Sequence, residues 1–154
     1  MKKTQESGRS MVEMLGVLAI IGVLSIGGIA GYTMAMNRYR ANEVIDMANK
    51  VASLAFAQNQ TSIARTGRDL VTAGTALNSI TPLSLGLIPN DANNGGGNMP
   101  GGATLEVTDI DEDSVTMKIT FPTEGVCTAG HNILGQGDAC DAQFAVDNVD
   151  FRQS

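Results

Sequence analysis

The chain has 154 residues, a net charge of −6 and 43% hydrophobic residues, which fits one small domain with an added anchor. After Leu70 the only basic residues are Lys118 and Arg152, against eleven acidic ones. Proteins that bind nucleic acid need a basic surface for the phosphates, so no direct binding of nucleic acid is expected.

The N-terminus combines a short polar leader with a long apolar segment. Residues 1–8 form the leader, which carries Lys2 and Lys3 and ends at Gly8. From Met14 to Asn37 there is no charged residue. At about 1.5 Å per residue, a helix over 14–37 is long enough to cross a hydrocarbon core of about 30 Å. Because basic residues precede this segment, the positive-inside rule places the N-terminus in the cytoplasm.

Glu13 directly precedes this apolar segment. A carboxylate at the centre of a bilayer costs on the order of 3 kcal/mol, and less near the interface. Cleavage after Gly8 would free an α-amino group on Arg9, and this amine can neutralise Glu13 of an adjacent subunit. The alternative is that Glu13 only caps the first helical turn, where a carboxylate is favourable.

Beyond Tyr32 the helical pattern continues but becomes amphipathic. Small and apolar residues recur at spacings of three and four: Val44, Ala48, Val51, Ala52 and Ala55. We predict one spine helix over 9–58, whose first half lies in lipid and whose second half packs on the rest of the chain. Glycine and alanine in the apolar half allow neighbouring helices to approach closely, although they are also compatible with a generic single-pass anchor.

The remaining residues, 59–154, are predicted to form a globular head. Alternation with a period of two, clearest from Val115 to Phe121, indicates antiparallel strands. A sheet of three strands needs a cover on one face, and the spine helix can supply it. The predicted fold class is therefore α+β. The expected elements of the head are a helix at 69–80, an apolar segment at 83–89, a loop at 90–102, strands at 103–108, 115–121 and 143–151, and a hairpin at 109–114.

The only two cysteines, Cys127 and Cys140, lie near the C-terminus. If the head is outside the cytoplasm, a disulfide between them would persist. Closing so short a loop stabilises a domain by about 3 kcal/mol in the chain-entropy model. The alternative is two free thiols.

No combination of residues indicates catalysis, so an enzyme is not expected. Asp109, Asp111 and Asp113 have the spacing of a calcium loop, but Ser114 and Thr120 stand where glycine and glutamate are needed. A solvated hairpin turn is expected there instead. His131 is the single histidine, which makes a zinc site improbable and a surface loop position the expectation. We predict neither a metal nor a cofactor.

Taken together, Gly8, Glu13 and the apolar spine resemble the class III signal of type IV pilins and related pseudopilins. The resemblance implies that a prepilin peptidase cuts between Gly8 and Arg9 and methylates the new N-terminus. It also implies that Glu13 is the carboxylate that guides subunit docking, with copies of the chain and the inner-membrane pilus assembly machinery as partners. The sequence departs from the family at Arg9, where phenylalanine or methionine is usual, and at Ala30, where many spines carry proline.

The distal half resembles the head of type IVb pilins more loosely. The resemblance rests on Ile88-Pro89, the glycine-rich loop, two strands and the C-terminal cysteine pair. It implies a pilin fold in which a Cys127–Cys140 disulfide bounds region 127–140 on the fibre surface.

The function expected from this resemblance is that of a precursor of a structural pilus subunit. The precursor would span the inner membrane once and move to a cell-surface fibre after cleavage. Two alternatives stay open. One is a pseudopilin of a type II secretion system. The other is an extracytoplasmic domain with an ordinary signal peptide or anchor, for which 25–27 and 28–30 offer small-residue cleavage sites.

Overall fold

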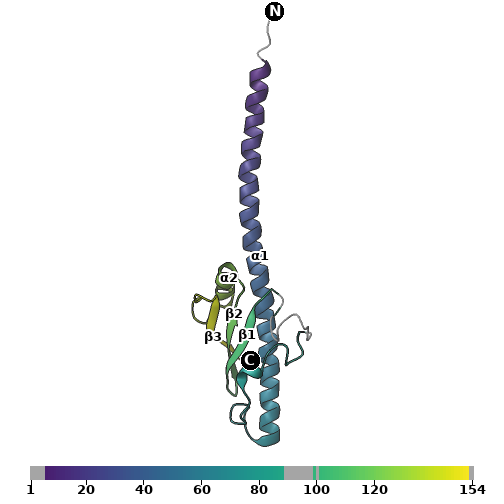
Figure 1. The fold of residues 1–154 in the computed structure, drawn as a ribbon, viewed down its shortest axis with the longest axis vertical. Helices are drawn as coiled ribbons and strands as arrows, with labels where there is room; N and C mark the ends of the chain where they lie inside the picture. The colour runs from purple at the N-terminus through teal and green to yellow at the C-terminus, as the bar shows by residue number, and fades with distance from the viewer. Residues whose placement is uncertain (1–5, 89–98, 100, 153–154) are drawn as a thin grey trace, which may run out of the picture. The chain divides into compact units, whose positions relative to one another are not determined.

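The computed structural model describes residues 6–88, 99 and 101–152. Its elements are α1 (Glu6–Thr66), the short 3-10 helix η1 (Leu77–Ser79), β1 (Thr104–Ile110), β2 (Ser114–Thr120), α2 (Glu124–Leu134) and β3 (Ala145–Arg152) (Figure 1). The chain divides into two compact units, Met1–Met36 and Asn37–Ser154. The predicted α+β class, with a long N-terminal helix packed on a small antiparallel sheet, is confirmed.

Helix α1 extends past the predicted end at Gln58 and continues through Thr66. Residues 52–66 contain several alanines and no glycine or proline, a composition that favours helix. Arg65 lies in the last turn, where a positive charge is favourable, and the Gly67 N–H donates to the Ile63 carbonyl at 2.8 Å.

The second unit has its core between α1 and the sheet. The residues predicted to form the buried side of the helix are buried: Val44, Ala48, Val51, Ala52 and Ala55 are all at most 4% exposed. Facing them are alternate residues of the sheet, including Val107, Val115, Met117 and Ile119. The buried residues of α1 recur at spacings of three and four and so lie on one side of the helix, which accounts for the helical pattern seen in the sequence.

The strand order is β1-β2-β3, and both pairs are antiparallel. The three predicted strands are confirmed, with ends that differ by one or two residues, and the connecting hairpin is shortened to 111–113. Both ladders contain a register shift, one between Val107 and Asp109 and one opposite Met117 and Ile119. In β3 the shift lies between Val146 and Val149, so both valines are buried although they are three residues apart.

Phe144 does not share a strand face with Val146, as the alternation predicted. It precedes β3 with a positive φ of 60°, and its carbonyl accepts a hydrogen bond from the Phe121 N–H. The aromatic ring therefore reaches the core from a turn rather than from the sheet.

The predicted helix at 69–80 is wrong. The segment forms turns, and only Leu77–Ser79 is helical, as a 3-10 turn. Gly74 adopts a left-handed conformation, with φ 82°, and interrupts any continuous helix. Asp69 caps the first turn, and hydrogen bonds from Thr72 hold the pKa of its carboxyl below the ordinary value.

The apolar segment predicted at 83–89 does pack against the core. Ile88 is buried, and Leu85 and Leu87 are partly buried against the core cluster. Pro89 and residues 90–98 and 100 of the predicted loop lie outside the described residues. Met99 is 3% exposed and belongs to the same core.

Helix α2 was not expected from the sequence. Gly125 and Gly130 lower its helix propensity, but both glycines lie where another side chain comes close. A Cβ at Gly130 would overlap the Phe121 ring, and one at Gly125 would lie 2.6 Å from Nδ2 of Asn37. Close packing therefore requires glycine at positions where helix propensity alone would disfavour it.

Candidate functional site

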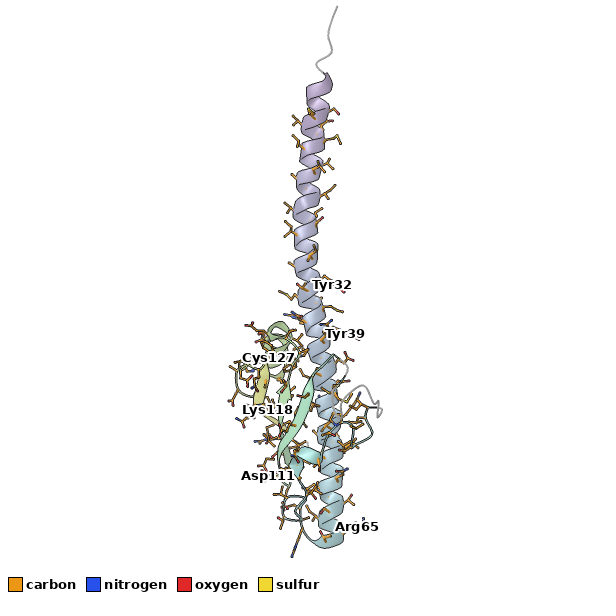
Figure 2. The ribbon with its side chains drawn as sticks, viewed as in Figure 1. Tyr32, Tyr39, Arg65, Asp111, Lys118 and Cys127 are labelled. Carbon is orange, nitrogen blue, oxygen red and sulfur yellow. A yellow bond between two sulfur atoms is a disulfide. The ribbon has the colours of Figure 1, made fainter. Side chains whose placement is uncertain are left out.

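The first unit presents an apolar surface that no described part of the chain covers. Helix α1, taken from Ser10, is long and apolar enough to cross a membrane, and its most apolar stretch of 18 residues is 0% buried. Its large apolar side chains between Met11 and Met34 are between 53% and 73% exposed. Figure 2 shows side chains projecting around this part of the helix, with Tyr32 labelled.

Polar groups within this surface are satisfied inside the helix. The Ser25 hydroxyl donates to the Ile21 carbonyl at 2.8 Å, and the Thr33 hydroxyl donates to the Ala30 carbonyl at 2.9 Å. Neither hydroxyl needs water as a partner. The surface is therefore suited to surroundings that offer no hydrogen bonds, such as lipid or another apolar helix.

The three residues of the predicted processing site lie at the beginning of α1. Gly8 and Arg9 belong to its first turns, and Glu13 follows on the same helix with its side chain exposed. The three residues thus share one continuous helix.

The predicted disulfide is present. Cys127 and Cys140 are bonded, with a Cα–Cα distance of 6.1 Å, and no described cysteine is free. Cys127 is fully buried on α2, and Cys140 is half-buried in the loop before β3 (Figure 2). The bond connects α2 to the loop before β3.

Hydrogen bonds also hold the loop inside the disulfide against β3. The Gln136 side chain donates to the Asp150 carbonyl at 2.8 Å, and the Asn148 side chain donates to the Asp138 carboxylate at 2.7 Å. Next to Cys140, the Asp141 carboxylate accepts the backbone N–H of Ala145 and of Gln143. The Ala145 hydrogen bond is the main cause that lowers the pKa of Asp141. The Gln136 and Asn148 hydrogen bonds connect the loop to β3 in addition to the disulfide.

The structure does not bring together the residues that were considered for a metal site, the aspartates at 109–113 and His131. Asp109 lies in β1, where its carboxylate accepts the N–H of Ile110, while Asp111 and Asp113 lie in the hairpin. Over the residues that the structure describes, no group of three acidic, cysteine or histidine side chains is arranged to hold a metal. His131 is not in a surface loop, as the sequence suggested, but half-buried in the last turn of α2.

Asn59 is a structural residue that the sequence analysis missed. Its side chain is 1% exposed, accepts the Leu70 N–H at 2.9 Å and donates to the Asp111 carbonyl at 3.4 Å. It thereby connects α1, the segment after it and the β1–β2 hairpin. The available signal was a polar residue four positions after Ala55, on the buried side of the helix.

Replacing Asn59 by alanine is expected to lower the free energy of unfolding of the second unit by about 1–3 kcal/mol, because the Leu70 N–H and the Asp111 carbonyl lose part-buried hydrogen bonds. Asn49→Ala is the matched control, since Asn49 is exposed on the same helix. The measurement is protease resistance of the detergent-solubilised chain over a urea series. Equal midpoints for the two variants would contradict the role of Asn59.

Comparison with protein-family models, with curated proteins and with solved structures found no match to this chain.

Proposed function

We propose that this chain is the precursor of a type IV pilin subunit, a structural protein that polymerises through its N-terminal helix. The proposed fold is the pilin fold. In it α1 is the spine, and the head consists of residues 59–154 together with the part of α1 that the sheet covers. The proposed partners are other copies of the chain, a prepilin peptidase and an inner-membrane assembly machinery. The proposed location is the inner membrane before assembly and a surface fibre afterwards.

The observation that carries the proposal is the uncovered apolar half of α1. Burying one large aliphatic side chain is favourable by about 1.5–3 kcal/mol, so leaving the whole set from Met11 to Met34 in water is strongly unfavourable. Lipid can cover this surface in a monomer, and the same helix of neighbouring copies can cover it in a fibre. Transfer between the two keeps the apolar surface out of water throughout.

The form of the second unit supports the same proposal. The buried side of α1 from Ala41 to Phe56 is covered by the sheet, while its apolar half is not covered by any described residue. One continuous helix thus joins a membrane-compatible segment to a folded, disulfide-bonded head. A disulfide is expected to persist only outside the reducing cytoplasm, which agrees with export of the head.

The charges near the N-terminus supply a docking mechanism. Cleavage after Gly8 would place a new α-amino group four residues before Glu13. This amine carries a positive charge that pairs with the Glu13 carboxylate of an adjacent copy in surroundings of low dielectric constant, where the attraction is larger than in water. Such pairing fixes the axial offset between helices, which apolar packing alone leaves variable.

The experiment that tests the proposal is intact-mass and N-terminal analysis of the chain isolated from its native host. We expect a first residue of Arg9 with a methylated α-amino group, and we expect the chain in sheared surface fibres. Gly8→Leu should leave the leader attached, because a bulky side chain obstructs the peptidase, whereas Gly8→Ala is the conservative control.

Other first residues would identify the alternatives. An N-terminus near 26–31 would indicate a signal peptide removed by the ordinary secretory route, and the proposal would fail. A chain that retains Met1 and stays in the membrane would indicate a simple anchor. Correct cleavage without any surface fibre would favour a pseudopilin.

A further inference from the structure

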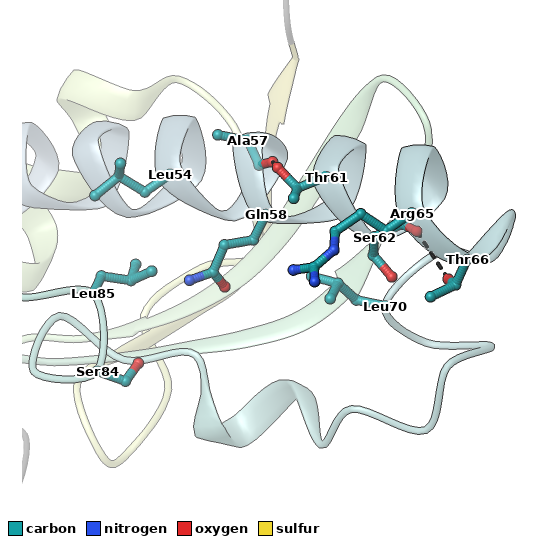
Figure 3. Close-up of a pocket in the computed structure, with 10 residues that line it drawn as sticks. All are labelled: Leu54, Ala57, Gln58, Thr61, Ser62, Arg65, Thr66, Leu70, Ser84 and Leu85. Carbon is teal, nitrogen blue, oxygen red and sulfur yellow. Dashed lines mark hydrogen bonds between the residues drawn. The ribbon is translucent and has the colours of Figure 1, made fainter.

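The second unit contains a groove that its own core does not fill. It lies between the end of α1 and the segment at 70–85 and has a volume of about 750 Å³ (Figure 3). Its apolar walls are formed by Leu54 on α1 and by Leu70 and Leu85 on the facing segment. Arg65 is the one charged residue among those that line it.

Two hydrogen-bond donors in this groove have no partner in the described part of the chain. Figure 3 shows the side chains of Gln58 and Arg65 extending from α1 toward the segment with Leu70 and Ser84. The neighbouring hydroxyls are already used, because Thr61 donates to the Ala57 carbonyl and Ser62 to the Arg68 carbonyl. The Arg65 guanidinium and the Gln58 amide therefore remain available to a ligand.

A guanidinium next to an amide is complementary to a carboxylate, because it can donate two parallel hydrogen bonds to the two oxygens. The same unit exposes carboxylates of this kind at its β1–β2 hairpin. Asp111, Glu112 and Asp113 are consecutive and exposed, and of the three, Asp113 also attracts the Arg152 guanidinium, whose pKa is raised by Asp150 and to a smaller extent by Asp113. The charge of the groove thus matches the charge of a protruding part of the same chain.

The groove and the hairpin face different directions, so one copy cannot join them to each other. Asn59 directs its side chain to the hairpin, where it contacts the Asp111 carbonyl. Arg65 follows six residues later, which is a rotation of about 120° around the helix axis. Two complementary surfaces on different sides of one unit give a head-to-tail contact, and such contacts form open filaments where the rotation between copies does not close a ring.

We propose that the groove beside Arg65 receives the Asp111–Asp113 hairpin of a second copy of this chain. The inference rests on the proposed function, because it assigns a contact between heads within the assembled fibre. In this contact the carboxylates bind Arg65 and Gln58, while the leucine walls exclude water from the ion pairs.

The first test is a charge exchange in the full-length chain, with sheared surface fibre as the measurement. Arg65→Glu and Glu112→Arg should each lower the fibre yield at least tenfold, and the double variant should return it to within threefold of the unaltered chain. Arg68→Glu is the matched control, since it makes the same charge change outside the groove and should stay within twofold. Non-reducing electrophoresis checks that each variant retains the Cys127–Cys140 disulfide.

A photo-crosslinker at Gln58 identifies the occupant directly. We expect a covalent dimer whose second peptide contains residues 111–113. Normal fibres from Arg65→Glu, or a crosslink to another segment or another protein, would overturn the groove proposal and leave the proposed function intact. If the unaltered chain makes no fibre, the proposed function fails on its own. In that case, a Gln58 dimer at 111–113 in membranes would support the groove contact, and its absence would overturn it.

Discussion

Replacing Glu13 by alanine is expected to reduce surface fibre at least tenfold while leaving cleavage after Gly8 unchanged. The Glu13 carboxylate is expected to have two opposite effects, one on insertion into lipid and one on contact between copies. In a lipid-embedded monomer a charged residue is unfavourable, by about 3 kcal/mol at the centre of the bilayer and by less near its surface. Removing Glu13 should therefore ease insertion of the helix. A loss of assembly would then show that the carboxylate is needed for contact between copies.

The measurement compares processed monomer in the membrane with subunit in sheared fibres. We expect monomer to accumulate as fibre disappears. Glu13→Gln keeps the size of the side chain and removes its charge, so it should behave like alanine if the ion pair matters and like the unaltered chain if only volume matters. Glu43→Ala is the control for an exposed acid on the same helix. Normal fibre from Glu13→Ala would remove the docking role.

The parts of the fold that follow a simple period could be predicted from the sequence. Val44, Ala48 and Ala55 lie on one side of a helix, and their burial needs only a sheet of matching width. Val115, Met117 and Ile119 alternate with polar residues and occupy the core face of β2. In both cases the local preference of the chain and the tertiary packing favour the same structure.

The two elements that the sequence did not predict correctly, α2 and the segment at 69–80, have a different physical origin. In helix α2, Gly130 lies against the Phe121 ring, a contact that a pattern of propensities does not reveal. The segment at 69–80 has the composition of a helix, but Gly74 adopts a left-handed conformation and turns the chain. At Gly130 a tertiary contact therefore opposes local propensity, whereas at Gly74 the conformational freedom of glycine itself interrupts the helix.

The candidate sites also differ in whether the sequence alone reveals them. Gly8 and Glu13 could be identified because their register with an apolar segment is a property of the sequence itself. The groove beside Arg65 could not, since Gln58 and Leu85 are brought together only by the turns between them. Its charge was visible in the sequence, but its freedom from other partners in the described chain required the structure.

Loss of the Cys127–Cys140 disulfide is the second large expected effect. The double variant Cys127→Ala, Cys140→Ala should lower the free energy of unfolding of the second unit by about 3 kcal/mol, because the unfolded chain regains the freedom of a closed loop. The effect should be uneven. Cys127 belongs to the core that α1 and the sheet share, but the bond itself connects only α2 to the loop before β3, so we expect α2 to lose more protection than the sheet.

Hydrogen–deuterium exchange of the full-length chain in detergent resolves this unevenness. We expect amides at 124–134 to exchange about a hundredfold faster in the double variant, while amides of β2 lose less protection, since local opening requires less free energy than global unfolding. Ala139→Ser, next to Cys140 and exposed, is the matched control. The hydrogen bonds of Gln136 and Asn148 should still hold part of the loop on β3. Unchanged exchange at 124–134 would mean that the contacts of Val126 and Gly130 alone fix α2, and that the disulfide stabilises the head through the unfolded state only.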